Sequence, residues 1–186
     1  MKYLDFVFRL PLLLHAGAAF ASIGAYLSVK AQLDASYAAS KHPVHFFIGQ
    51  TTFDGPTIKA HFAAMIETGT LDIFRQTQLI DFVFILCMAL LSMFLCTLVA
   101  RASRPGSWGR RIGIWAGLAV ILGALCDAIE NALSFILLAD PTGFPDWLAL
   151  PYSSIAAIKF GLLTVGMLGV FVSLVLAGLN RLTRKS

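Results

Sequence analysis

Four long apolar stretches dominate the pattern of hydrophobic and polar positions along the chain. They cover about residues 4–29, 79–100, 112–138 and 152–179. Each contains at least the roughly 20 apolar residues that a helix needs to cross a bilayer. The pattern predicts an all-α fold, a four-helix transmembrane bundle in which residues 1–186 form a single membrane domain.

The connection between the first two stretches, residues 30–78, is long for a helix bundle, where about 2–8 residues are common. Asp54-Gly-Pro-Thr57 is typical of a helix start and Gly69 of a helix end, which predicts a short helix over residues 56–68. We expect this helix to lie over the outer mouth of the bundle. Its apolar residues could form a lid, an interfacial anchor or a partner surface.

The composition agrees with a membrane protein and excludes an ordinary soluble domain. Hydrophobic residues make up 58% of the chain and charged residues 13%, against about 45–50% and about 25% in soluble domains. The net charge of +4 does not indicate nucleic-acid binding, because the basic residues lie at the ends of the apolar stretches.

The distribution of lysine and arginine residues between the two sides of the membrane predicts the orientation of the chain. One side of the membrane receives nine of them, and the other receives only Lys30, Lys41, Lys59 and Arg75. The positive-inside rule therefore places both termini in the cytoplasm and residues 30–78 outside, as expected for a multi-pass protein of a bacterial-type inner membrane. The nine are Lys2, Arg9, Arg101, Arg104, Arg110, Arg111, Arg181, Arg184 and Lys185.

Small residues recur at intervals of four in the predicted spans. Examples are Gly113 and Gly117 in the third span, Gly17, Ala21 and Ala25 in the first, and Ala157 and Gly161 in the fourth. Such spacing lets two helix backbones approach each other in lipid, which predicts helix contacts at these positions.

The third span carries the most informative polar residues. Asp127, Glu130, Asn131 and Ser134 are spaced i, i+3, i+4 and i+7, so they share one face of a helix. Carboxylates inside a membrane are costly and face a bundle interior or a wet cavity rather than lipid. This face is therefore expected to point inward.

The neighbouring spans bring further polar groups to a similar depth. Gln78 and Asp81 begin the second span, and Lys159 lies two turns after Tyr152 in the fourth. Counted at about 1.5 Å per residue, these groups and the acidic face of the third span meet in the outer half of the bundle. We expect Lys159 to pair with Asp127 or Glu130.

This polar cluster has two interpretations. The simpler one is a structural salt-bridge network in which Lys159 neutralises a carboxylate and sets the helix register. Against it, three acids outnumber one base, so at least one carboxyl group is expected to carry a proton, and we assign that proton to Glu130. A protonated acid beside an ionised one suits acid–base chemistry, and equally a cation or proton site, although the inner halves of the spans offer no comparable polar groups.

No cofactor or metal is predicted. His15 is alone on the first span and is expected to bond a backbone carbonyl. His42, His45 and His61 could bind a metal in the long connection, but Pro43 separates the first two and no cysteine accompanies them.

Two resemblances follow from these residues. The run Gln78-x-x-Asp81-Phe-Val-Phe, then Asp127-x-x-Glu130-Asn131, then Lys159 resembles a family of small four-span bacterial membrane proteins without an assigned activity. The likeness covers about residues 71–175. The architecture is also similar to the emopamil-binding-protein family of sterol isomerases and sterol-binding receptors, which implies acidic residues in a membrane cavity.

We therefore expect a polar cavity that binds a membrane lipid or small amphiphile of sterol or isoprenoid type. The alternative is a non-catalytic accessory subunit that binds a protein partner in the membrane. The candidate catalytic residues are Asp127, Glu130, Asp81 and Lys159, and the candidate ligand-binding residues are Asn131, Gln78, Ser134 and Tyr152.

Overall fold

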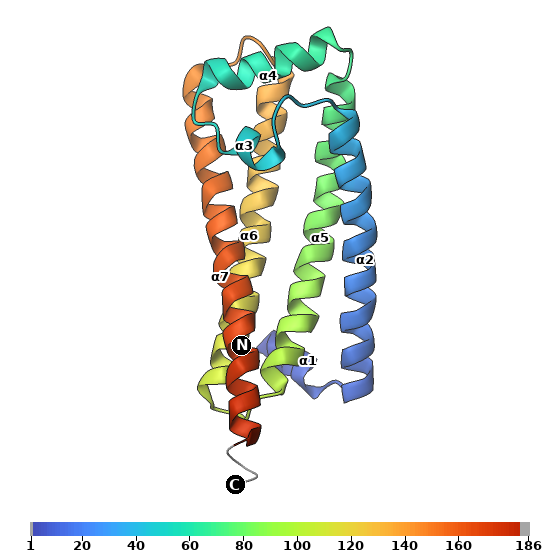
Figure 1. The fold of residues 1–186 in the computed structure, drawn as a ribbon, viewed down its shortest axis with the longest axis vertical. Helices are drawn as coiled ribbons and strands as arrows, with labels where there is room; N and C mark the ends of the chain where they lie inside the picture. The colour runs from blue at the N-terminus through green and yellow to red at the C-terminus, as the bar shows by residue number, and fades with distance from the viewer. Residues whose placement is uncertain (1, 183–186) are drawn as a thin grey trace. The chain divides into compact units, whose positions relative to one another are not determined.

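The computed structural model describes residues 2–182, and these residues form helices and no strands (Figure 1). Within this described range, four helices are long and apolar enough to cross a membrane. The predicted all-α, four-span architecture is therefore confirmed. Arg184 and Lys185, two of the residues in the charge count, lie outside the described residues. The elements are α1 (Lys2–Arg9), α2 (Leu12–Ala39), α3 (Phe46–Gln50), α4 (Gly55–Glu67), α5 (Leu71–Arg101), α6 (Trp108–Ala139), η1 (Asp146–Leu148) and α7 (Ala149–Leu182).

The first span differs from the predicted residues 4–29. The helix breaks before Pro11, which lacks a backbone N–H, and α2 then continues to Ala39. Lys30 and Asp34 form an ion pair one turn apart at 2.5 Å, which supports the helix beyond its apolar stretch. At the break, Arg101 donates a hydrogen bond of 2.7 Å to the carbonyl of Leu10.

The long connection is more helical than its sequence suggested. α4 covers Gly55–Glu67, close to the predicted residues 56–68, with the Asp54 side chain accepting a hydrogen bond of 2.9 Å from the Thr57 amide. Gly69, at φ +67°, follows its end. The short helix α3 was not predicted, and α5 already begins at Leu71 rather than at residue 79.

Residue contacts divide the chain into two compact units. Unit 1 consists of Met1–Tyr26, Cys87–Gly123 and Gly161–Ser186. Unit 2 consists of Leu27–Leu86 and Ala124–Phe160. Each of the four long helices therefore contributes one segment to each unit.

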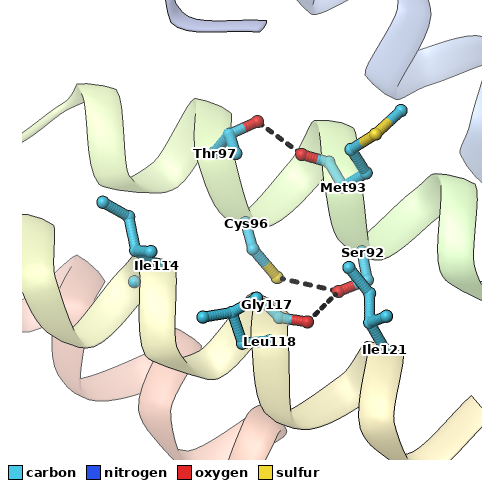
Figure 2. A pocket seen from close by; sticks show the side chains of 9 residues that line it. Ser92, Met93, Cys96, Thr97, Ile114, Gly117, Leu118 and Ile121 are labelled. Carbon is cyan, nitrogen blue, oxygen red and sulfur yellow. Dashed lines mark hydrogen bonds between the residues drawn. The ribbon is translucent and has the colours of Figure 1, made fainter. Parts of the chain in front are cut away.

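Close approach of helices α5 and α6 characterises unit 1. A Cβ atom at Gly113 or Gly117 would lie 3.0 Å from the Cβ atom of Ala100 or Cys96, so the predicted contact of these glycines is confirmed. Figure 2 shows Ser92, which donates a hydrogen bond of 3.0 Å to the Gly117 carbonyl, beside a cavity of about 10 Å³. That volume is about the size of one water molecule.

Two further predictions concern the other small residues and His15. Gly17, Ala21 and Ala25 are exposed, as are Ala157 and Gly161 on α7, so the predicted contacts at these residues are wrong within the described chain. Their spacing is compatible with a helix contact but does not require one, and here they face away from the other helices. His15 Nε2 lies 3.0 Å from the Phe94 carbonyl oxygen, as expected for a core histidine.

In unit 2, α4 covers one end of the helix bundle. Its buried residues pack against the start of α5, the end of α6 and the start of α7 in one hydrophobic core. The predicted position of this helix over the mouth of the bundle is confirmed for unit 2, while its side of the membrane stays a prediction. The core contains Ile58, Phe62, Met65, Leu71, Phe74, Leu137, Leu138, Phe144, Ala149 and Tyr152.

Candidate functional site

The candidate site is centred on Lys159, which is buried on α7 within unit 2. Its Nζ atom donates hydrogen bonds to Asp127 Oδ1 at 2.8 Å, to Glu130 Oε2 at 2.8 Å and to Gln50 Oε1 at 3.0 Å. An ammonium group has three N–H donors, and all three are used here. The expected pairing of Lys159 is confirmed, with both acids instead of one.

A second chain of hydrogen bonds runs beside the first on the same face of α6. Asn131 Nδ2 donates to Asp81 Oδ2 at 2.8 Å. Gln78 Nε2 donates to Ser134 Oγ at 2.7 Å and, more weakly, to Asn131 Oδ1 at 3.4 Å. The i, i+3, i+4, i+7 spacing therefore brings the third-span residues together with the second span, as expected.

Glu130 is the least satisfied member of the cluster. Its exposed fraction is 0%, and among the described residues its Oε1 atom has no partner at hydrogen-bond geometry. The buried Tyr152 hydroxyl lies close enough to interact with the same carboxyl group. All eight predicted site residues thus lie in one cluster, while their chemical roles stay predictions.

The cluster has an excess of negative charge. Asp81, Asp127, Glu130 and Lys159 are the buried charged residues in the described part of the chain, and all four belong to unit 2. Three carboxylates against one ammonium leave a net charge of −2 when every group is ionised. A buried charge is tolerated only when it is paired and hydrogen-bonded, so this excess has to be met by a proton or by a bound group.

Gln50 is the site residue that the sequence did not reveal. It ends the short helix α3, which has no ionisable side chain, and its neutral amide reaches Lys159. The same segment is held to α7 a second time, because Ser153 Oγ donates to the Thr52 carbonyl at 2.9 Å. An amide after three apolar residues, Phe46-Phe47-Ile48, is the only local signal that could have indicated a buried partner.

The three histidines of the connection are not all gathered at one point. The rings of His42 and His61 lie 5.1 Å apart, whereas the His45 side chain accepts a hydrogen bond from the Phe47 amide at the start of α3. Within residues 2–182, no three His, Cys, Asp or Glu side chains are grouped to hold a metal ion. Burial lowers the pKa of His42 to about 4 against the opposing effect of its bond to Val44, and His61 lowers it further.

Comparison of the chain with protein-family models, with curated proteins and with solved structures gives no match. The two resemblances drawn from the sequence therefore stay predictions. What the chain does has to be inferred from the geometry and charge of the cluster itself.

Proposed function

We propose that this integral membrane protein binds a lipid-like amphiphile of sterol or isoprenoid type at the buried acidic cluster and acts on it by acid–base chemistry. The observation that carries the proposal is the combination of excess negative charge with the unpartnered Oε1 atom of Glu130. A hydroxyl or amino group of an amphiphile would satisfy that oxygen. The proposed setting is a bacterial-type inner membrane.

Each charged residue has a role in this proposal. Lys159 pairs with both Asp127 and Glu130 at 2.8 Å, and in this proposal the two acids share the work of base and acid. Asp81 adds to the negative charge of the cluster. Tyr152 lies beside the Glu130 carboxyl group, where its hydroxyl can contact a bound head group.

The polar residues on α5 and α6 hold Asp81 in position. Asn131 contacts Asp81, and Gln78 connects Asn131 with Ser134. Amide and hydroxyl groups of this kind satisfy a buried carboxylate without adding charge. They therefore restrain the geometry and leave the charge excess in place.

The test is Glu130→Gln, compared with Glu67→Gln on the exposed end of α4. Lys159 keeps Asp127 and Gln50 as partners in Glu130→Gln, so we expect the thermal stability to stay close to that of the wild type. Mass spectrometry of lipid extracted from protein purified in mild detergent should find one small molecule per chain in the wild type and in Glu67→Gln. It should be lost in Glu130→Gln.

A second candidate function is supported by a different observation. All three donors of Lys159 are satisfied within the chain, which is what a purely structural network of an accessory subunit needs. If Glu130→Gln unfolds the protein and the wild type carries no bound small molecule, the structural function is correct and the proposal of lipid chemistry is wrong.

A further inference from the structure

The short helix α3 lies beside the first third of the membrane-spanning helix α7 and not beyond its end. Gln50 contacts Lys159, which is ten residues after the first residue of α7, or about 15 Å along the helix. The Phe47 ring packs on the Phe160 ring of α7 with centroids 4.7 Å apart. Figure 1 shows α4 across the end of the helices of unit 2 and α3 farther along them.

The outward face of α3 is apolar. Phe47 is 48% exposed and Ile48 is 54% exposed, and Phe46 and Phe53 are exposed as well. Four large exposed apolar side chains within eight residues are unfavourable in water. They are the expected surface of a segment in contact with lipid, where exposed apolar side chains carry no penalty.

Three backbone carbonyls of the same segment, those of Phe47, Ile48 and Thr52, are satisfied by side chains of the protein. Thr51 Oγ1 donates to the Phe47 carbonyl at 2.7 Å, and Thr52 Oγ1 donates to the Ile48 carbonyl at 2.6 Å. The Thr52 carbonyl itself accepts the hydrogen bond from Ser153. Irregular backbone at membrane depth is tolerated only when its polar groups find partners in the protein, and these hydroxyl groups supply them.

We propose that Phe46–Phe53 is a re-entrant segment that enters the hydrocarbon region of one leaflet and contacts the acyl chains there. The occupant of its apolar face is the leaflet, because the face is continuous with Phe160 on the membrane-spanning helix and lies at the depth of Lys159. The inference needs only the four-span architecture and is independent of the proposed lipid chemistry. In this position the segment separates the acyl chains of the leaflet from Lys159.

Spin labels measure the depth of the segment directly. Ile48→Cys and Phe47→Cys are each prepared in a full-length chain in which Cys87, Cys96 and Cys126 are replaced by alanine. Ile158→Cys, exposed on α7 next to Lys159, is the control for lipid, and Ala60→Cys, exposed on α4, is the control for the region outside the bundle. The labelled proteins are reconstituted in vesicles of phosphatidylcholine and phosphatidylglycerol.

Power saturation then compares collisions of each label with oxygen, which partitions into lipid, and with a water-soluble nickel chelate. We expect the oxygen-to-nickel ratio at position 48 to match that at position 158 and to exceed that at position 60 several-fold. A ratio at position 48 equal to that at position 60 overturns the proposal. If Ile48→Cys does not fold, as judged by its thermal transition, the label at position 47 decides in the same way.

Discussion

Gln50 Oε1 accepts a hydrogen bond from Lys159 Nζ at 3.0 Å, although the two residues are separated by 109 positions in the chain. Without Gln50, the ammonium group would have only the two carboxylates for its three N–H donors. The connection between α2 and α5 is thus part of the buried polar cluster. We therefore expect substitution of Gln50 to leave one N–H donor of Lys159 without a partner.

Gln50→Leu should therefore destabilise the protein by about 1–3 kcal/mol, the cost of leaving a buried charged donor unsatisfied. Gln76→Leu, the same change at an exposed position of α5, is the control and should change stability by less than about 0.5 kcal/mol. Thermal and denaturant unfolding in detergent measure both. Equal effects of the two substitutions would mean that the Gln50 contact contributes no stability.

Lys159→Met should have a larger effect because it strands two buried carboxylates. Removal of one partner from a buried ion pair costs about 3–5 kcal/mol, and here Asp127 and Glu130 both lose their cation. Adding Glu130→Gln to Lys159→Met removes one stranded charge and should recover part of the loss. Strictly additive free energies of unfolding in this double mutant would argue against coupling between the two residues.

The charge excess predicts opposite effects for two isosteric substitutions at one hydrogen bond. Asp81→Asn removes a surplus negative charge and keeps an oxygen that accepts from Asn131. Its stability should equal or exceed that of the wild type. Asn131→Asp places a fourth carboxylate against Asp81 and should lower stability by about 1–3 kcal/mol. If Asp81→Asn is the more damaging of the two, the cluster does not carry a charge excess.

The sequence predicted the acidic cluster well because helical periodicity determines which residues share a face. Asp127, Glu130 and Asn131 are on one face of any regular helix, and the lengths of the spans bring Lys159 to their depth. Gln50 could not be predicted in this way, since α3 is only five residues long and no period relates it to α7.

The errors in the spans have a similar origin. Hydropathy marks the part of a helix that is in lipid, whereas the helix itself continues for as long as local interactions support it. Helix α2 continues to Ala39, past the ion pair of Lys30 and Asp34. Helix α5 already begins at Leu71, before the apolar stretch starts. Spacing of small residues is less informative, because Gly113 and Gly117 contact α5 while Gly17 and Ala21 are exposed.

The lowered pKa of His42 predicts that the stability of the protein depends on pH. Its pKa falls from the usual 6.5 to about 4 in the folded protein, where it faces Tyr37 and His61. Between these values the unfolded chain binds more protons than the folded chain, so stability is full above pH 6.5 and is lost as the pH falls toward 4. The expected loss from this residue is on the order of 2–3 kcal/mol.

The measurement compares thermal unfolding of the wild type with that of His42→Asn from pH 7.5 to pH 4. Asparagine keeps a hydrogen-bonding group near the Val44 backbone and does not titrate in this range. The wild type should lose more stability than the variant between about pH 6.5 and pH 4. Parallel curves for the two proteins would show that His42 keeps an ordinary pKa in the folded state.

The last prediction concerns the orientation of the chain, with both termini in the cytoplasm and α4 outside. It depends on the distribution of nine basic residues on one side and four on the other. Ala60 on α4 and Ala102 after α5 are both exposed alanines, so they form a matched pair for labelling. Each is changed to cysteine in a chain that lacks the three native cysteines. A membrane-impermeant maleimide should label Ala60→Cys in intact cells and Ala102→Cys only after the cells are opened. The reverse pattern would show that the orientation is inverted, and it would place the acidic cluster in the cytoplasmic leaflet without changing its geometry.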